Sequence, residues 1–257
     1  MAGFFPSYVA EIASTGLDVD VTWNDWPVHQ AAEAEMMKTS SVRLNAMTLE
    51  SANVLRVLVK PLDPSLGIPK RPILEVRLFQ MLSDQEQTTL FRHFYHPGLR
   101  PLDPEGWVEV ARHEMLFTRT FGRYQWEDGP AFMPSDRGDV LAALVRLHNA
   151  IGRRDFDTFA KECAVKLEET TRATGRDRAM VGEEEVEKLK AFATLKDWAL
   201  APLDLEKIEL TSSALGRLVT PSLGGLAALV VRTGEGGPAF PFPVTFGRVR
   251  GQWAVVR

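Results

Sequence analysis

Cysteine is nearly absent from this chain, and its scarcity limits the redox chemistry that the protein can perform. Cys163 is the single cysteine among 257 residues, so no disulfide can form within the chain. This usage is compatible with a reducing compartment, and we expect a cytoplasmic protein. Cys163 lies in a helical pattern. Because free cysteine is among the most buried residue types, we expect it to be a core side chain rather than a nucleophile.

An excess of positive charge and a long apolar run are also missing. The chain has 30 lysines and arginines against 34 acidic residues, for a net charge of −4, so no basic field favours nucleic acid or an anionic membrane. No stretch approaches the roughly 18 apolar residues of a spanning helix. The start, MAGFFPSY, lacks the cationic and apolar segments of a signal peptide. We expect no nucleic-acid partner, no membrane partner and no export.

The composition and length are those of an ordinary globular protein with two domains. Hydrophobic residues make up 45% and charged residues 25% of the sequence, as in most soluble folds. The pattern changes near residue 135 from strand-like alternation to helical spacing. We therefore expect an α+β protein, with an N-terminal antiparallel β-sandwich over residues 1–134. Residues 135–257 are expected to form a C-terminal domain of three helices and a curved antiparallel sheet.

Alternating apolar and polar residues predict six or seven short strands in the N-terminal half. Residues 17–23 and 73–80 show the clearest alternation, and Asn24 and Asp25 form a turn after the first of these segments. A short helix is expected within residues 30–39. The other expected strands are residues 26–29, 41–45, 53–59, 107–113 and 116–121.

Helical spacing of apolar residues begins in the C-terminal half, where Ser135 or Asp136 supplies a cap. The first expected helix carries an apolar stripe from Val140 to Ile151, and the second begins at Asp155. The third expected helix covers residues 183–200, and three strands follow at residues 207–219, 226–233 and 244–256.

A short motif in the C-terminal half resembles a known superfamily. The segment from Leu144 to Phe159 contains a Gly-Arg-Arg-Asp-Phe turn between two helices, and the last expected strand carries the pattern Gly251-x-Trp253. With these motifs, residues 138–257 resemble the cystatin-like or nuclear-transport-factor-2-like superfamily. The resemblance implies helices packed inside a strongly bent antiparallel sheet that often lines a cavity, with Trp253 against the first helix. The chain departs from the family pattern, since no strand is expected between the second and third helices. No catalytic residue is carried over.

Three histidines are open to interpretation as metal ligands. His93 and His96 are three residues apart, a spacing that suits two ligands on one helix, and His113 would be a third ligand. The run from Tyr95 to Gly98, which contains Pro97, is instead typical of a turn. We predict no bound metal. We also predict no nucleotide or other cofactor. No helix is expected after the glycine-rich run at residues 234–237, and the glycine pair at residues 224–225 is not followed by the Lys-Ser/Thr of a phosphate-binding loop.

His148 and Asp155 are the acid–base candidates if the protein is an enzyme. His148 lies on or beside the apolar stripe of the first helix, and Asp155 opens the second. A structural interpretation stands beside the catalytic one. His148 would then be a hydrogen-bonded histidine at the edge of the core, and Asp155 the cap of its helix.

Four aromatic residues are the candidates for contact with a ligand or partner. Trp23 and Trp26 flank the turn at Asn24, and exposed aromatics at such a position stack on sugars or anchor partner proteins. Tyr124 and Trp126 lie near the expected domain junction. The alternative is that Trp23 and Trp126 fill the core. Trp26 shares its turn with polar residues and is the best candidate for exposure.

No convergent set of acid, base, nucleophile and metal ligands emerges from these residues. We therefore expect a non-enzymatic binding protein that captures another protein, as a bacterial immunity or accessory factor does. Two alternatives stay open. One is an isomerase- or hydrolase-like enzyme that uses a cavity in the C-terminal domain, and the other is a carbohydrate-binding module that uses Trp23 and Trp26.

Overall fold

The computed structural model describes residues 6–33, 36–63, 73–82, 86–95, 106–117, 122–194, 197–233 and 239–257. The chain forms two compact units, residues 1–122 and 123–257, each with its own hydrophobic core. The sequence predicts a domain boundary at residues 134–135, about a dozen residues after the division between these two units. A boundary at residues 134–135 stays a prediction.

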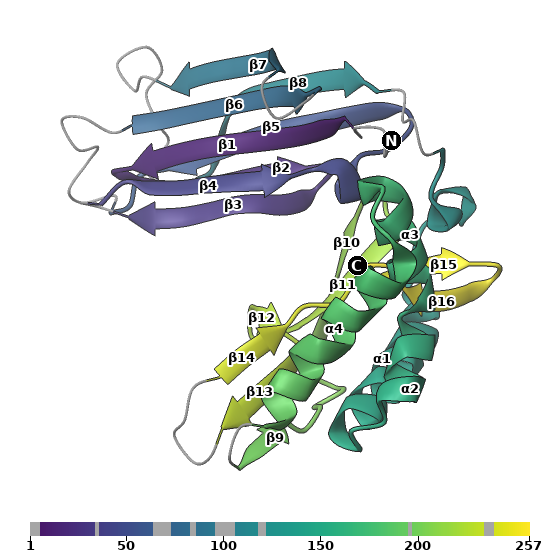
Figure 1. Ribbon diagram of the computed structural model, residues 1–257. Coiled ribbons are helices and arrows are strands. Elements are labelled where there is room, and N and C mark those ends of the chain that lie inside the picture. Colours follow the sequence, from purple (N-terminus) through teal and green to yellow (C-terminus); the bar gives the residue numbers. More distant parts are fainter. Residues whose placement is uncertain are drawn as a thin grey trace. The chain divides into compact units, whose positions relative to one another are not determined.

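The predicted α+β class is confirmed. Antiparallel sheets make up the N-terminal unit, and α-helices with further antiparallel sheets make up the C-terminal unit (Figure 1). In the described parts of the chain, no helix is both long and apolar enough to cross a membrane.

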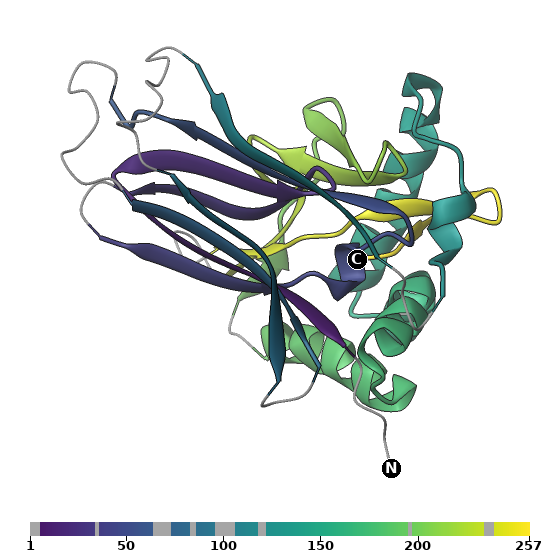
Figure 2. The ribbon, with the colours of Figure 1, turned by 90° about the horizontal axis from the view of Figure 1, so that it is seen from above.

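The N-terminal unit is a β-sandwich. One sheet has the strand order β4-β1-β6-β7 and the other β3-β2-β5-β8, and the two sheets lie face to face (Figures 1 and 2). Apolar side chains of both sheets, such as Ile12 and Leu78 in the first and Val19 and Leu55 in the second, fill a common core. The strands are β1 (Ser7–Thr15), β2 (Leu17–Trp23), β3 (Trp26–Glu33), β4 (Lys38–Arg43), β5 (Ala52–Lys60), β6 (Ile73–Met81), β7 (Gln87–Tyr95) and β8 (Val108–Leu116).

Pairing between strands explains where this unit differs from the expectation. The helix expected within residues 30–39 is wrong, because β3 pairs with β2 as far as Glu33 and β4 begins at Lys38. Sheet partners thus override the helix-favouring alanines and glutamates of this segment. β1 and β7 were not predicted. Small side chains such as Ala10 and Ser14 occupy buried positions in β1, and a bulge opposite Leu78 breaks the alternation of β7.

A buried histidine links the two sheets of the sandwich. The Nε2 atom of His29 lies 2.9 Å from the Ser14 hydroxyl, and its Nδ1 atom lies 2.8 Å from the Ser40 hydroxyl. Burial lowers the pKa of the His29 imidazole, and the positive charge of Lys38 lowers it further. His29 is therefore neutral in the folded protein at neutral pH.

We expect His29 to make the folded protein less stable in mild acid. Its unfolded pKa is about 6.5 and its folded pKa is lower, so the unfolded chain binds more protons as the pH falls through 6.5. The free energy of unfolding should therefore fall between about pH 7.5 and pH 5.5, and His29→Gln should flatten that slope. Urea titrations at several pH values across this range measure the free energy of unfolding, with His113→Gln as the control. Identical slopes for wild type and His29→Gln would contradict this account.

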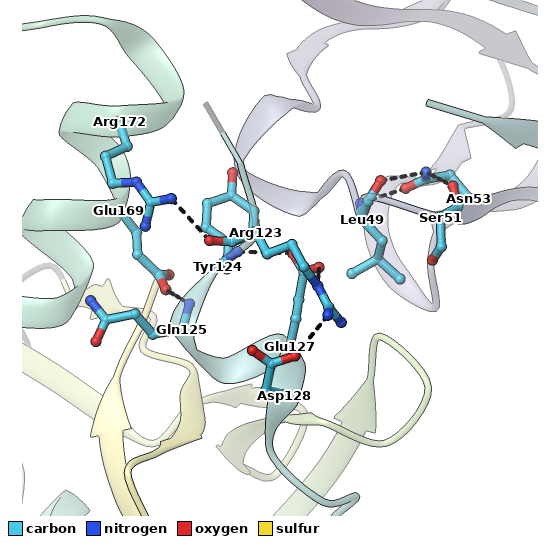
Figure 3. Close-up of polar contacts among 10 residues, drawn as sticks. All are labelled: Leu49, Ser51, Asn53, Arg123, Tyr124, Gln125, Glu127, Asp128, Glu169 and Arg172. Atoms are coloured by element: carbon cyan, nitrogen blue, oxygen red, sulfur yellow. Dashed lines mark hydrogen bonds and ion pairs between the residues drawn. The ribbon is translucent and has the colours of Figure 1, made fainter. Parts of the chain in front are cut away.

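A second buried polar residue fixes the connection between β4 and β5. The Asn53 side chain accepts a hydrogen bond from the Leu49 backbone amide (2.7 Å) and donates to the Leu49 carbonyl (2.9 Å) (Figure 3). It also accepts from the Asn24 side chain (2.8 Å). These bonds hold the connection against the turn that follows β2. Asn24 and Asp25 have φ of 54° and 64°, and such left-handed conformations are tolerated best by asparagine, aspartate and glycine.

The C-terminal unit packs helices against antiparallel strands around one core, which includes Leu144, Phe159, Val219 and Phe246. One sheet has the order β10-β11-β15-β16 and another the order β14-β13-β9. The helices are α1 (Arg137–Gly152), α2 (Phe156–Glu162), α3 (Ala164–Thr174) and α4 (Arg178–Ala193). The strands are β9 (Trp198–Leu200), β10 (Ile208–Ser213), β11 (Leu218–Leu223), β12 (Leu226–Ala227), β13 (Leu229–Thr233), β14 (Ala239–Phe242), β15 (Phe246–Val249) and β16 (Gln252–Val255).

Four α-helices are described where three were expected, because the second helix is interrupted at Cys163. This residue ends α2 and precedes α3 with φ −90° and ψ 5°, outside the helical range. Cys163 is buried, as predicted, and burial raises the pKa of its thiol to about 12, so a reactive thiolate is absent at neutral pH. The last helix begins at Arg178, since the Asp177 carboxylate accepts from the Ala179 amide (2.8 Å).

Two expected long strands are hairpins. The segment 207–219 turns at Ala214 and Leu215, and the segment 244–256 turns at Arg250 and Gly251. A third expected strand, residues 226–233, bends at Ala228. Its first part pairs with β11 and its second part with β9 and β14, so this segment takes part in both sheets.

Candidate functional site

Three of the four aromatic candidates lie inside the protein. Trp23 is buried in the sandwich core, and Tyr124 and Trp126 are buried in the C-terminal unit. In this structure their rings cannot stack on a ligand, and the core interpretation of Trp23 and Trp126 is the one that burial supports. Trp26 is partly exposed, which leaves it available for contact with a partner.

The two acid–base candidates bond to separate partners. The His148 Nε2 atom lies 2.9 Å from the Ala201 carbonyl. Asp155 caps α2 by accepting from the Thr158 amide (3.0 Å) and hydroxyl (2.7 Å), and these bonds lower the pKa of its carboxyl. Each side chain therefore has the structural role that was the alternative to catalysis.

Two of the three histidines considered for metal binding lie on strands of different sheets. His93 is on β7 and His113 is on β8, and Phe91 stacks on His113 with ring centroids 4.5 Å apart. His96 lies outside the described residues. Within the described ranges, no group of three potential ligands is placed to hold a metal. The absence of a bound metal stays a prediction.

The main candidate site is a groove in the C-terminal unit, which we call the α1–β16 groove. It has a volume of about 810 Å³. Helix α1 forms one wall, the end of α2 and the first half of α3 form another, and the β15–β16 hairpin with Gln125 completes it. It is lined by Gln125, Asp139, Ala142, Arg146, Lys161, Glu162, Ala164, Val165, Glu168, Val249, Arg250, Gly251, Gln252, Trp253 and Ala254.

Charge of both signs lines the α1–β16 groove. The lining includes three acidic residues, Asp139, Glu162 and Glu168, and three basic residues, Arg146, Lys161 and Arg250. The Arg146 and Glu162 side chains form an ion pair at 3.3 Å. Pockets for small molecules are mostly apolar with a few polar groups, whereas protein interfaces mix apolar contact with a polar and charged rim. The lining of the groove fits the second class.

Glu169 anchors one end of this groove. Its carboxylate is fully buried, with 0% exposure. It accepts a hydrogen bond from the backbone amide of Gln125 at 2.9 Å (Figure 3). It also accepts from the Trp126 indole and the Arg257 guanidinium, each at 2.9 Å. Gln125 and Glu168, the neighbour of Glu169, both line the groove. The Glu169 hub, defined as Glu169 with these three donors, therefore fixes the position of two groove residues.

Aromatic stacking reinforces the Glu169 hub. The Arg257 guanidinium lies 4.4 Å from the centre of the Tyr124 ring and 5.8 Å from that of Trp126. Trp126 also packs closely on β15, where an added Cβ at Gly247 would lie 2.7 Å from the Trp126 Cβ. Burial raises the pKa of the Glu169 carboxyl, and the charge of Arg257 and the N–H donors oppose that rise.

A second set of bonds fastens the segment before the hub. The Arg172 guanidinium on α3 donates to the Arg123 carbonyl at 3.0 Å (Figure 3). Arg123 in turn forms an ion pair with Asp128 at 2.9 Å, and the Glu127 carboxylate accepts from the Tyr124 amide at 3.2 Å. Residues 123–128 are thus tied to α3 and to themselves.

The sequence singled out Tyr124 and Trp126, but neither Glu169 nor Arg257 was among the expected site residues. Glu169 lies in the run Lys166-Leu-Glu-Glu-Thr170, where it has the appearance of a solvent-facing carboxylate. Its partner Arg257 is far away in the sequence. Only the polar N–H of Trp126, which needs an acceptor once it is buried, pointed to a buried polar partner.

The comparisons with known proteins leave the family open. The chain matches no protein-family model, no curated protein and no solved structure. The resemblance to the cystatin-like or nuclear-transport-factor-2-like superfamily thus rests on the short motifs around Leu144–Phe159 and at Gly251 and Trp253, and it stays a prediction.

Proposed function

We propose that this protein is a cytoplasmic, non-enzymatic binding protein that captures another protein through the α1–β16 groove. The observation that carries the proposal is the lining of the groove, in which three acids and three bases surround a wide and polar space. The described residues that line it include no histidine, cysteine or serine that could serve as a catalytic base or nucleophile. Capture of one protein by another is the activity of a bacterial immunity or accessory factor, and we propose that class.

The chemistry of the groove favours a partner segment with charges of both signs. The Arg146–Glu162 pair is partly exposed, with side-chain exposures of 54% and 24%, and such pairs contribute little to stability. A carboxylate of the partner can therefore replace Glu162 beside Arg146 at small cost. Arg250, at the tip of the β15–β16 hairpin, offers a second cation.

The two alternatives have less support. The enzyme alternative relied on His148 and Asp155, and neither residue lines the groove. The carbohydrate alternative relied on Trp23 and Trp26, and Trp23 is buried.

A photo-crosslinking amino acid in the groove tests the proposal. Ala142 is exposed on α1 and lines the groove, so the crosslinker at position 142 should form a discrete adduct with one protein in a lysate of the native cells. A second substitution, Arg250→Glu, should weaken that adduct about tenfold or more, because it puts a like charge against the partner's carboxylates. Mass spectrometry of the adduct then identifies the partner.

Ala239, exposed on β14 and outside the groove lining, is the matched control position. The same crosslinker at position 239 should give no such adduct. Equal adducts from both positions, or an adduct at position 142 that is insensitive to Arg250→Glu, would count against the groove as the binding surface.

A further inference from the structure

The outer face of the sheet β3-β2-β5-β8 carries a shallow depression that the proposed function does not use. We call it the Trp107 trough. It has a volume of about 390 Å³ and is lined by Asp18, Val19, Asp20, Gln30, Ala31, Ala32, Lys38 and Trp107. All of these residues belong to the N-terminal unit.

Strand register places the polar side chains of the trough side by side. Along β2, the residues Leu17, Val19 and Val21 are buried in the sandwich core, so the alternate residues Asp18 and Asp20 point to the outer face. Asp18 pairs with Ala32 and Asp20 with Gln30 on the neighbouring strand. Ala32 is exposed and lines the trough.

Trp107 supplies an apolar wall at the other end of the trough. It immediately precedes β8, and 44% of its surface is exposed. The Lys60 ammonium lies 4.6 Å from the ring centre, and Lys60 also forms an ion pair with Asp18 at 3.2 Å. These contacts orient the ring through the attraction between a cation and an aromatic face. An aromatic side chain held in this way beside carboxylates has the features of a ligand platform.

The polar groups of the trough are matched in charge. Asp18 and Asp20 in the lining are offset by Lys38, which also lines the trough, and by Lys60, the ion-pair partner of Asp18. The Asp20 carboxylate accepts from the Gln30 side-chain amide at 3.3 Å. Lys38 donates to the Gln30 carbonyl at 3.0 Å. Burial raises the pKa of the Asp20 carboxyl, so this incompletely hydrated carboxylate gains from a further hydrogen-bond donor. The trough therefore suits a neutral ligand that is rich in hydroxyl groups.

We propose that the Trp107 trough binds a neutral saccharide. The C–H face of one sugar ring would stack on the indole of Trp107, and its hydroxyls would donate to Asp20 and accept from Gln30 and Lys38. A nucleotide is disfavoured because its phosphates would meet Asp18 and Asp20. The platform differs from the tryptophans at residues 23 and 26 that the sequence suggested, and the site is independent of the α1–β16 groove.

Calorimetric titration of the full chain tests this proposal, with cellohexaose, maltohexaose and the hexamer of N-acetylglucosamine as probes. At least one of these sugars should bind. Trp107→Ala should weaken that binding about tenfold or more, or abolish it, because the stacking surface is lost. Asp20→Asn should weaken it by a smaller factor, since the amide keeps one acceptor oxygen.

Trp26→Ala is the matched control, because Trp26 is also partly exposed in the same unit and does not line the trough. It should leave the affinity unchanged. Thermal melting should show that Trp107→Ala stays folded, as expected for a half-exposed side chain. The proposal is overturned if none of the three sugars binds to wild type, if Trp107→Ala binds as tightly as wild type, or if Trp26→Ala loses binding to the same extent.

Discussion

Replacing Glu169 with alanine is expected to lower the free energy of unfolding of the C-terminal unit by about 3–5 kcal/mol, the usual cost of removing one partner of a buried ion pair. Glu169 is fully buried, and its loss leaves the Arg257 guanidinium and the Trp126 indole without their shared acceptor. Since a domain is stable by only about 5–15 kcal/mol, Glu169→Ala should unfold at a much lower urea concentration. Far-UV circular dichroism measures the transition.

Glu168→Ala is the matched control for this experiment. Glu168 is the neighbouring residue on α3 and lines the groove without belonging to the hub, so its loss should change stability by no more than about 0.5 kcal/mol. The double variant Glu169→Ala with Arg257→Ala should cost less than the sum of the single variants, because the two side chains interact directly. Additive costs, or a Glu169→Ala protein as stable as Glu168→Ala, would refute the role of the hub.

Trp253→Ala is expected to have a similarly large effect, about 3–5 kcal/mol. Trp253 is only 5% exposed and belongs to the same core as Leu144 of α1, as the sequence predicted. Phe132 meets its ring edge-on at 6.0 Å, and the Arg248 guanidinium lies 5.0 Å from the ring centre. The Trp253→Ala protein should therefore be insoluble or melt far below wild type, although residue 253 is near the end of the sequence.

Two further variants separate packing from other effects at this position. Trp253→Phe should cost much less than Trp253→Ala, because most of the apolar surface is kept and the Trp253 indole N–H has no hydrogen-bond partner among the described residues. Gln252→Ala, an exposed neighbour on β16, should be close to wild type. If Trp253→Ala melts within a degree or two of wild type, the β15–β16 hairpin does not anchor the helices.

The sequence predicted best those elements whose local pattern agrees with their tertiary surroundings. β2 alternates strictly between core and surface, and its predicted bounds, residues 17–23, are those observed. The turn at Asn24 and Asp25 follows from residues that tolerate a left-handed backbone. The first helix of the C-terminal unit has a regular apolar stripe and was predicted for the same reason.

Elements whose ends depend on distant partners were missed. The turn between β10 and β11 places Ala214 and Leu215 at φ of 50° and 60°. Neither residue is a glycine or asparagine, the residues that mark a tight hairpin. The glycine of this turn, Gly216 at φ 79°, lay inside the expected strand. The segment 226–233 is continuous in hydrophobicity, and only its pairing with two different sheets divides it at Ala228.

The candidate site was harder to predict than the fold, because its parts come from separate stretches of sequence. The acids and bases of the α1–β16 groove lie on α1, the end of α2, α3 and the β15–β16 hairpin, and each of them resembles an ordinary surface charge when read alone. Glu169 and Arg257 become a pair only when α3 packs against the segment that follows β16.

Hydrogen–deuterium exchange of the full chain, with and without the partner identified by crosslinking, tests most directly whether the α1–β16 groove holds that partner. The account predicts slower amide exchange in residues 139–146, 161–168 and 249–254, which form the three walls of the groove. It also predicts that Arg250→Glu removes this protection at the same partner concentration. Protection confined to residues 6–122, with the three wall segments unchanged, would contradict it.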